Sequence, residues 1–216
     1  MIRLIILDFD GVILESVEVK TEAFRSLFSF SPDHVDEIEA FHRQNGGMSR
    51  FDKFDYIYKN ILKEPLSSQR KEELSEKFSA HVFEKMLSAR FVVGAWDFIQ
   101  RFHTAIPLYI ISATPEPELV QITSRRNLTP YFRRIYGSPR KKSDCIREII
   151  AQTGVPVSDI VFVGDALNDL DAAKDAQVRF IGREGESGQT GFLNRPGVEA
   201  VIQDLRELQC YIEEHL

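Results

Sequence analysis

Short apolar runs rich in Ile, Val and Phe recur along this chain and alternate with longer segments whose apolar residues have helical spacing. Five of these runs predict β-strands, at residues 4–9, 107–113, 133–137, 159–165 and 178–182. Strands that are apolar throughout and alternate with helices are typical of a parallel sheet covered on both faces. We therefore expect an open α/β sheet with helices on both faces.

Two helices between these strands are marked by their ends. Segment 115–127 has Pro115 and Pro117 in what would be its first turn, where a helix tolerates proline. Segment 142–154 closes at Gly154, a residue type that commonly follows the last helical turn. Both segments are therefore predicted to be helices that connect neighbouring strands.

One interval interrupts the alternation of strands and helices. About 95 residues between Gly11 and Pro107 contain no convincing strand. Segments 17–30, 33–45, 49–62 and 67–87 each suit an amphipathic helix, and 94–104 suits a helix packed on the sheet. We predict that residues 15–87 form an inserted helical domain and that 1–14 and 88–216 form the α/β core.

The composition is that of an ordinary globular protein. Of the 216 residues, 43% are apolar and 28% are charged, which excludes a disordered chain. No run approaches the roughly 20 apolar residues needed to span a bilayer. The apolar run at 4–7 is also shorter than the core of a secretory signal, so we expect neither membrane insertion nor secretion.

The formal net charge of −6 argues against a general nucleic-acid-binding protein. Basic residues cluster at 133–134 and 140–142, and we interpret this cluster as solvated surface. Cys145 and Cys210 lack the spacing of a zinc site or a disulfide framework, so we expect a cytoplasmic protein. Segment 182–191 carries glycines without the spacing of a nucleotide-binding motif, and we expect a flexible loop there.

Acidic and hydroxyl side chains stand at the ends of three predicted strands. Asp8 and Asp10 end the first strand and Ser112 ends the second. Asp165 ends the fourth, and Asp169 follows four residues later. Because ligands in open α/β sheets bind beyond the carboxyl ends of the strands, we expect these side chains to face one small volume.

Two like charges at the end of a buried strand need a neutralising partner. Carboxylate oxygens suit a hard divalent cation, and Mg²⁺ typically takes one or two carboxylates and leaves positions for water and a substrate phosphate. A lysine before a predicted helix, Lys141 or Lys142, and the hydroxyl of Ser112 would then hold the other phosphoryl oxygens. The set indicates phosphoryl transfer with Mg²⁺ as cofactor.

The segments DFDGV, IIS, a lysine before a helix and GDALND, in this order, resemble the four motifs of the haloacid dehalogenase superfamily. The resemblance covers nearly the whole chain. It is to the branch of phosphoglycolate phosphatases and β-phosphoglucomutases, in which a helical cap is inserted after the first motif. It implies a Rossmann-like parallel core, an inserted α-helical cap domain and a hydrolase acting on phosphoric monoester bonds.

The resemblance also implies a role for each matching carboxylate. Asp8 would take the phosphoryl group as an aspartyl phosphate and would bind Mg²⁺. Asp10 would protonate the leaving alcohol, then act as base on the hydrolytic water, and would offer its backbone carbonyl to the metal. Asp165 would be the main remaining metal ligand, and Asp169 would act behind it, through water or by orienting the lysine.

The phosphoryl oxygens would be bound by Ser112, by the adjoining Ala113 and by the motif lysine. In similar proteins this lysine stands about four residues ahead of the first buried aliphatic residue of its helix, which here is Ile146. That spacing favours Lys142 over Lys141.

Within the insertion, the segment NGGMSRFDKF resembles the cap loop of related mutases and phosphatases, which helps to choose the substrate. Gly47 and Ser49 would let this loop turn, and Arg50 would pair with a carboxylate or a distal phosphate. The alternative is that Ser49 caps a helix and Arg50 is a surface residue.

Asp10 bears on the choice between reactions. Superfamily members that cleave carbon–halogen bonds lack the second aspartate, because a halide leaves without a proton, so Asp10 favours phosphate esters. The nearest alternative is a β-phosphoglucomutase-like phosphosugar mutase. Similar mutases carry a histidine early in the first cap helix, where this chain has Lys20 or Thr21, and this difference favours hydrolysis.

A non-enzyme alternative is a phosphate-accepting receiver domain or a catalytically silent relative. Receiver domains have no helical insertion and place their acidic pair differently from the phosphorylated aspartate, so this alternative agrees poorly with the sequence. We expect a phosphatase whose partner is a small phosphorylated metabolite, with no nucleic acid or membrane bound, and which is a monomer or homodimer.

Overall fold

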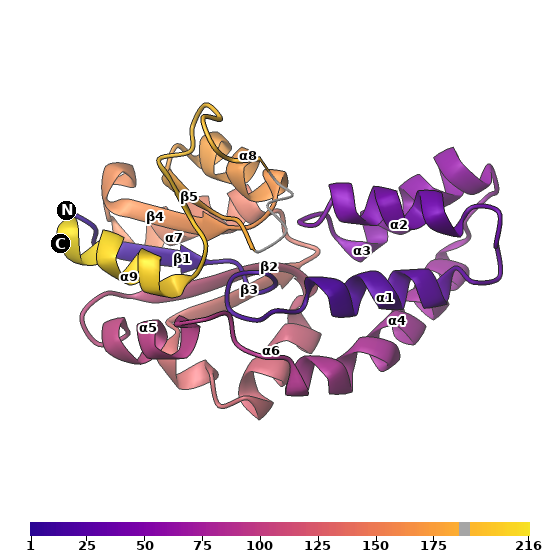
Figure 1. The fold of residues 1–216 in the computed structure, drawn as a ribbon, viewed down its shortest axis with the longest axis horizontal. Helices are drawn as coiled ribbons and strands as arrows, with labels where there is room; N and C mark the ends of the chain where they lie inside the picture. Colours follow the sequence, from indigo (N-terminus) through magenta and orange to yellow (C-terminus); the bar gives the residue numbers. More distant parts are fainter. Residues whose placement is uncertain (186–190) are drawn as a thin grey trace.

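The structure is a computed structural model that describes residues 1–185 and 191–216, so residues 186–190 of the segment expected to be a loop lie outside it. Figure 1 shows a sheet with helices packed on it and, at one end of that sheet, a group of helices from the first part of the chain. No helix among the described residues is long and apolar enough to cross a membrane.

The described strands form one parallel sheet in the order β3-β2-β1-β4-β5-β6. Their bounds are β1 Leu4–Leu7, β2 Leu108–Pro115, β3 Arg134–Ser138, β4 Ile160–Gly164, β5 Arg179–Arg183 and β6 Ala200–Ile202. The five predicted strands are present, which confirms the α/β class, and β6 adds a short edge strand. The strand order reverses at β1, the place where doubly wound sheets bind ligands.

Both faces of the sheet are covered, because successive side chains of a strand point to opposite sides. Ile5 and Leu7 of β1 lie in a core that includes helices α5, α6 and α9, whereas Leu4 and Ile6 lie in a second core with α7 and α8. The bounds of these helices are α5 Ala95–Phe102, α6 Glu116–Arg125, α7 Lys142–Thr153, α8 Leu167–Ala176 and α9 Leu205–Glu214.

The helices between β1 and α5 pack around aromatic side chains. Their bounds are α1 Val17–Leu27, α2 Val35–Gln44, α3 Arg50–Tyr56 and α4 Ser68–Ser88, with a π-helical segment η1 Ile57–Leu62 directly after α3. Phe24 of α1 contacts the rings of Phe28, His42, Phe54 and Phe78, so one ring joins all four α-helices of this group. A hydrophobic cluster that includes buried residues of this group continues into the core under the sheet.

Part of the basic cluster lies on the surface, as predicted. Arg134 and Arg140 are half-exposed and both pair with Glu148 of α7. Lys142 of the same cluster differs, because its side chain is only 9% exposed. Cys145 is buried, Cys210 is exposed, and both are free thiols.

Candidate active site

The chain turns sharply where β1 ends. The backbone N–H of Asp8 still donates to the carbonyl of Val163 in β4 (2.9 Å), which keeps Asp8 in register with the sheet. Gly11 then adopts a φ of +70°, and its N–H donates to the carbonyl of Leu14 (2.8 Å). This turn leads the chain away from the sheet and toward α1, and it leaves Asp8 and Asp10 at the carboxyl end of β1.

Asp8 and Asp169 share one ammonium group. Lys142, the first residue of α7, places Nζ 3.0 Å from Asp8 Oδ2 and 2.6 Å from Asp169 Oδ1. The other Asp169 oxygen accepts the N–H of Ala166 at 3.1 Å and so caps α8. Burial lowers the pKa of Lys142, but the carboxylates of Asp169 and Asp8 outweigh burial and hold that pKa above its usual value. Lys141, which directly precedes α7, is exposed, and of the two lysines it is Lys142 that pairs with Asp8 and Asp169.

Three carboxylates converge beside β1. Oxygens of Asp8, Asp165 and Asp169 all lie within 4.8 Å of one another. Burial raises the pKa of Asp8 to about 7, although Lys142 lowers it, and the neighbouring carboxylates add to the increase. Burial and then the charge of Asp8 likewise raise the pKa of Asp165. Carboxylates that repel one another in this way form a donor set that fits a hard divalent cation such as Mg²⁺.

Asp10 has a different environment. One carboxylate oxygen accepts the hydroxyl of Ser16 (2.6 Å), and the other accepts Lys20 Nζ (2.5 Å) and the hydroxyl of Thr114 (3.2 Å). Burial raises the pKa of Asp10, but the charge and hydrogen bond of Lys20 outweigh burial, so the pKa lies below its usual value. The two aspartates of the first motif therefore differ, Asp8 being the more easily protonated.

The end of β2 lies beside Asp10. Ser112 is buried, its Oγ lies 3.4 Å from Asp10 Oδ2, and it accepts the N–H of Thr114 at 3.1 Å. Ala113 and Thr114 line the same pocket as Asp8 and Asp10. The predicted hydroxyl is thus near the carboxylates, and Thr114, two residues further along the strand, is a second one.

Residues of helices α1 to α4 and of the loop between α2 and α3 line the pocket at these strand ends. Gly46, Gly47 and Met48 line the pocket, and a Cβ on Gly47 would lie 3.0 Å from the Cβ of Asn168, so the loop rests directly on the start of α8. Ser49 does not line this pocket. Its side chain accepts the N–H of Asp52 (3.2 Å) and caps α3.

Arg50 pairs with a carboxylate, as the first expectation allows, but that carboxylate belongs to the protein. The side chain is 4% exposed, so it is not a surface residue, and it lines the pocket. Its guanidinium donates to Glu118 of α6 at 2.9 Å and to Ser79 of α4 at 2.6 Å, and it lies over the ring of Phe78. Arg50 therefore connects the helical group to the helices on the sheet, and its charge is already paired.

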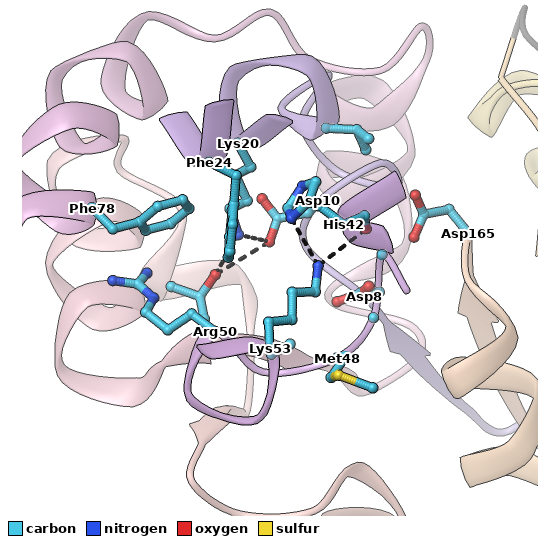
Figure 2. Close-up of a pocket in the computed structure, with 15 residues that line it drawn as sticks. Asp8, Asp10, Lys20, Phe24, His42, Met48, Arg50, Lys53, Phe78 and Asp165 are labelled. Carbon is cyan, nitrogen blue, oxygen red and sulfur yellow. Dashed lines mark hydrogen bonds and ion pairs between the residues drawn. The ribbon is translucent and has the colours of Figure 1, made fainter. Parts of the chain in front are cut away.

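Three titratable residues that line the pocket were not among the predicted site residues. Lys20, His42 and Lys53 extend from α1, α2 and α3 toward the strand ends (Figure 2). No local motif marks them, because each reaches the pocket through the packing of helices. A pattern that could have identified Lys53 is its place three residues after Arg50, one helical turn along the same face.

Comparison with known proteins gives consistent results. A family model described as a haloacid dehalogenase-like hydrolase matches residues 2–177. The chain is 23% identical to a phosphoglycolate phosphatase of Pseudomonas fluorescens, with 95% of this chain and 78% of that protein covered. It is 26% identical to an enolase-phosphatase of Marinobacter nauticus, with 99% and 100% covered.

Solved structures share the fold. A hydrolase from Pseudomonas syringae superposes with a TM-score of 0.80 at 19% identity, over 98% of both chains. A β-phosphoglucomutase from Clostridium difficile superposes with a TM-score of 0.77 at 18% identity, over 99% of this chain and 96% of the other.

Proposed function

The chain belongs to the haloacid dehalogenase-like hydrolases, and from that membership we propose that it is a Mg²⁺-dependent phosphatase of small phosphomonoesters. The observation that carries this proposal is the environment of Asp8. Its buried carboxylate lies 3.0 Å from the ammonium of Lys142 and within 4.8 Å of a carboxylate oxygen of Asp165, and Asp10 lies two residues further along the chain. This arrangement supports Asp8 as the nucleophile, Asp8 and Asp165 as the cation-binding pair, and Asp10 as the proton carrier.

In this proposal Mg²⁺ is held by Asp8, Asp165 and the backbone carbonyl of Asp10, with Asp169 behind them. The ion supplies positive charge that neutralises the carboxylates and the phosphoryl oxygens. The donor set supports this assignment, because burial and mutual repulsion raise the pKa values of Asp8 and Asp165 in the absence of a cation.

The chemistry follows from the side chains. An oxygen of Asp8 attacks phosphorus and the alcohol leaves with a proton from Asp10; water then attacks the aspartyl phosphate and returns a proton to Asp10. Ser112, the backbone at Ala113 and Lys142 bind the phosphoryl oxygens. Asp10 is ionised while Lys20 contacts it, which is the form that activates water in the second step, and it must take up a proton before it can protonate the alcohol in the first step.

We also assign residues 15–87 to a cap domain on a core formed by 1–14 and 88–216. The contacts of Gly47 with Asn168 and of Arg50 with Glu118 support closure of this cap over the carboxylates. Closure would exclude water from the phosphoryl group. The match to the haloacid dehalogenase-like hydrolase model spans residues 2–177, which argues against a receiver domain.

Hydrolases and mutases share this fold, so the superposition on a β-phosphoglucomutase does not distinguish the two reactions. What favours hydrolysis is that this chain has Lys20 or Thr21 where similar mutases have a histidine, and that the ammonium of Lys20 pairs with Asp10. The two relatives described above are named as phosphatases, and we extend that reaction class to this chain.

Phosphate release from p-nitrophenyl phosphate tests the proposal. We expect release that requires Mg²⁺, is abolished by a chelator and falls to the background rate in Asp8→Asn. Asp97→Asn, which changes an exposed aspartate on α5, serves as the matched control and should retain wild-type activity. Equal release by wild type and Asp8→Asn would show that Asp8 is not the nucleophile.

A further inference from the structure

Lys53 is a buried ammonium on the wall of the pocket that also contains Asp8 and Asp10 (Figure 2). It lies on α3 and is 2% exposed. Its Nζ is hydrogen-bonded to Nδ1 of His42 at 3.0 Å and to the carbonyl oxygen of His42 at 3.3 Å. It also lies 5.4 Å from the centre of the Phe24 ring. All of these partners are neutral groups.

The other basic side chains around the site each contact a carboxylate. Lys20 contacts Asp10, Arg50 contacts Glu118, and Lys142 contacts Asp8 and Asp169. Among the described residues, no carboxylate forms an ion pair with Lys53. A buried charge is normally paired, because leaving it unpaired in a protein interior is costly.

The electrostatics of Lys53 agree with a missing counter-charge. Burial, followed by the charge of Lys20, lowers the pKa of Lys53 to about 7, and the carboxylates of Asp10 and Asp165 only partly oppose this. His42 cannot compensate, because burial and neighbouring cations lower its own pKa to about 2 and keep it neutral. An anion placed next to Lys53 would supply the charge that the protein does not.

The pocket limits what that anion can belong to. Its cavity volume is about 50 Å³, the room of a few water molecules. Its remaining walls are largely apolar, being formed by Val17, Phe24, Met48 and Phe78. Such walls offer few partners for the many hydroxyls of a sugar, whereas a short acid would leave only its two charged ends to be bound.

We propose that Lys53 binds a second acidic group of the substrate, so that the enzyme acts on short phosphomonoesters that carry a carboxylate. This inference rests on the proposed phosphatase function, which places the phosphoryl group at Asp8. His42 and Phe24 are positioning residues in this account, because they hold the ammonium on the cavity wall without neutralising it.

A binding experiment tests the inference without turnover. Calorimetric titrations with MgCl₂ present would compare phosphonoacetate, which has a carboxylate, with 2-hydroxyethylphosphonate, which has a hydroxyl in its place. We expect wild type to bind phosphonoacetate at least tenfold more tightly. Lys53→Met and Lys53→Gln should each remove that preference, whereas Lys59→Met, at an exposed lysine of η1, should keep it.

A second readout uses wild type alone, so it does not depend on the folding of a variant. Because the pKa of Lys53 is about 7, binding of the carboxylated phosphonate at pH 8 should take up more protons than binding of the hydroxyl analogue. The groups that face Lys53 are Lys20, His42, Asp10 and Asp165, and they are the same in both titrations. Equal proton uptake with the two phosphonates would contradict the proposal.

A kinetic comparison separates this inference from the proposed function. The ratio of kcat/KM for 2-phosphoglycolate to that for 2-hydroxyethyl phosphate should fall at least tenfold in Lys53→Met. Turnover with an unchanged ratio would overturn the role of Lys53 and leave the phosphatase intact. A Lys53-dependent binding preference in a protein that releases no phosphate would support the role of Lys53 and contradict the phosphatase function.

Discussion

Replacement of Gly11 by alanine should disable the site by displacing a carboxylate. At the Gly11 φ of +70°, an added Cβ would lie 2.0 Å from Asp165 Oδ2 and 2.6 Å from its carboxyl carbon. The backbone is fixed on both sides, because Gly11 donates to Leu14 and its carbonyl accepts Arg183 Nη1 at 2.9 Å. Asp165 must therefore move until the contact reaches at least 3.0 Å, a shift of about 1 Å.

Gly11→Ala should reduce both stability and rate, and the two losses have separate causes. A left-handed backbone costs an alanine about 1 to 2 kcal/mol of stability. A displacement of ~1 Å at a reacting centre reduces the rate by roughly 100-fold. Gly154 provides the matched control, because its φ is +65° and an added Cβ there would meet nothing within 4 Å. Gly154→Ala should share the loss of stability and keep full activity.

Urea denaturation and steady-state hydrolysis of p-nitrophenyl phosphate at several Mg²⁺ concentrations would measure both losses. We expect Gly11→Ala to lose about 100-fold in kcat/KM and to need more Mg²⁺ for half-maximal activity. If Gly11→Ala were as active as Gly154→Ala, the reasoning that Asp165 needs the space beside Gly11 would be refuted.

Two further predictions follow from buried charges. Glu118→Ala should lower the free energy of unfolding in urea by about 3 kcal/mol, because it leaves Arg50 buried without its carboxylate. Glu22→Ala, which breaks an exposed ion pair, should change it by less than about 0.5 kcal/mol. Equal effects would contradict a stabilising role for the buried Arg50–Glu118 pair. Because the pKa of Asp8 is about 7 without a cation, Mg²⁺ must displace a proton when it binds. The Mg²⁺ affinity measured by calorimetry should therefore rise as pH increases from about 5.5 to 7.5. An affinity that does not change with pH would contradict Asp8 as a ligand.

The strand ends of the site were predictable from sequence. Asp8, Ser112 and Asp165 each follow a continuous apolar run, and parallel pairing alone brings the carboxyl ends of such strands to one edge. A lysine at this edge was also predictable, because the helix after β3 begins there, but the preference for Lys142 over Lys141 came from the spacing in similar proteins. These positions depend on local pattern and on a general rule of topology.

The side of the site formed by helices α1, α2 and α3 was less predictable. Lys20 and Lys53 lie on amphipathic helices whose apolar spacing shows which face is buried, but that spacing does not reveal what the face meets. Arg50 illustrates the same limit, because its partner Glu118 is 68 residues away in α6. The edge strand β6 has only three residues, too few for an alternating or continuous apolar pattern to stand out.

Trapping the phosphorylated residue tests the central claim, that Asp8 accepts the phosphoryl group, most directly. Asp10→Asn should still react with p-nitrophenyl phosphate, whose leaving group needs no proton, but it should fail to activate water, so the aspartyl phosphate should accumulate. After acid quench, peptide mass spectrometry should find one phosphoryl group on the peptide that carries Asp8, and only when Mg²⁺ was present. A phosphoryl group on another residue, or none in a variant that still releases p-nitrophenol, would contradict the account.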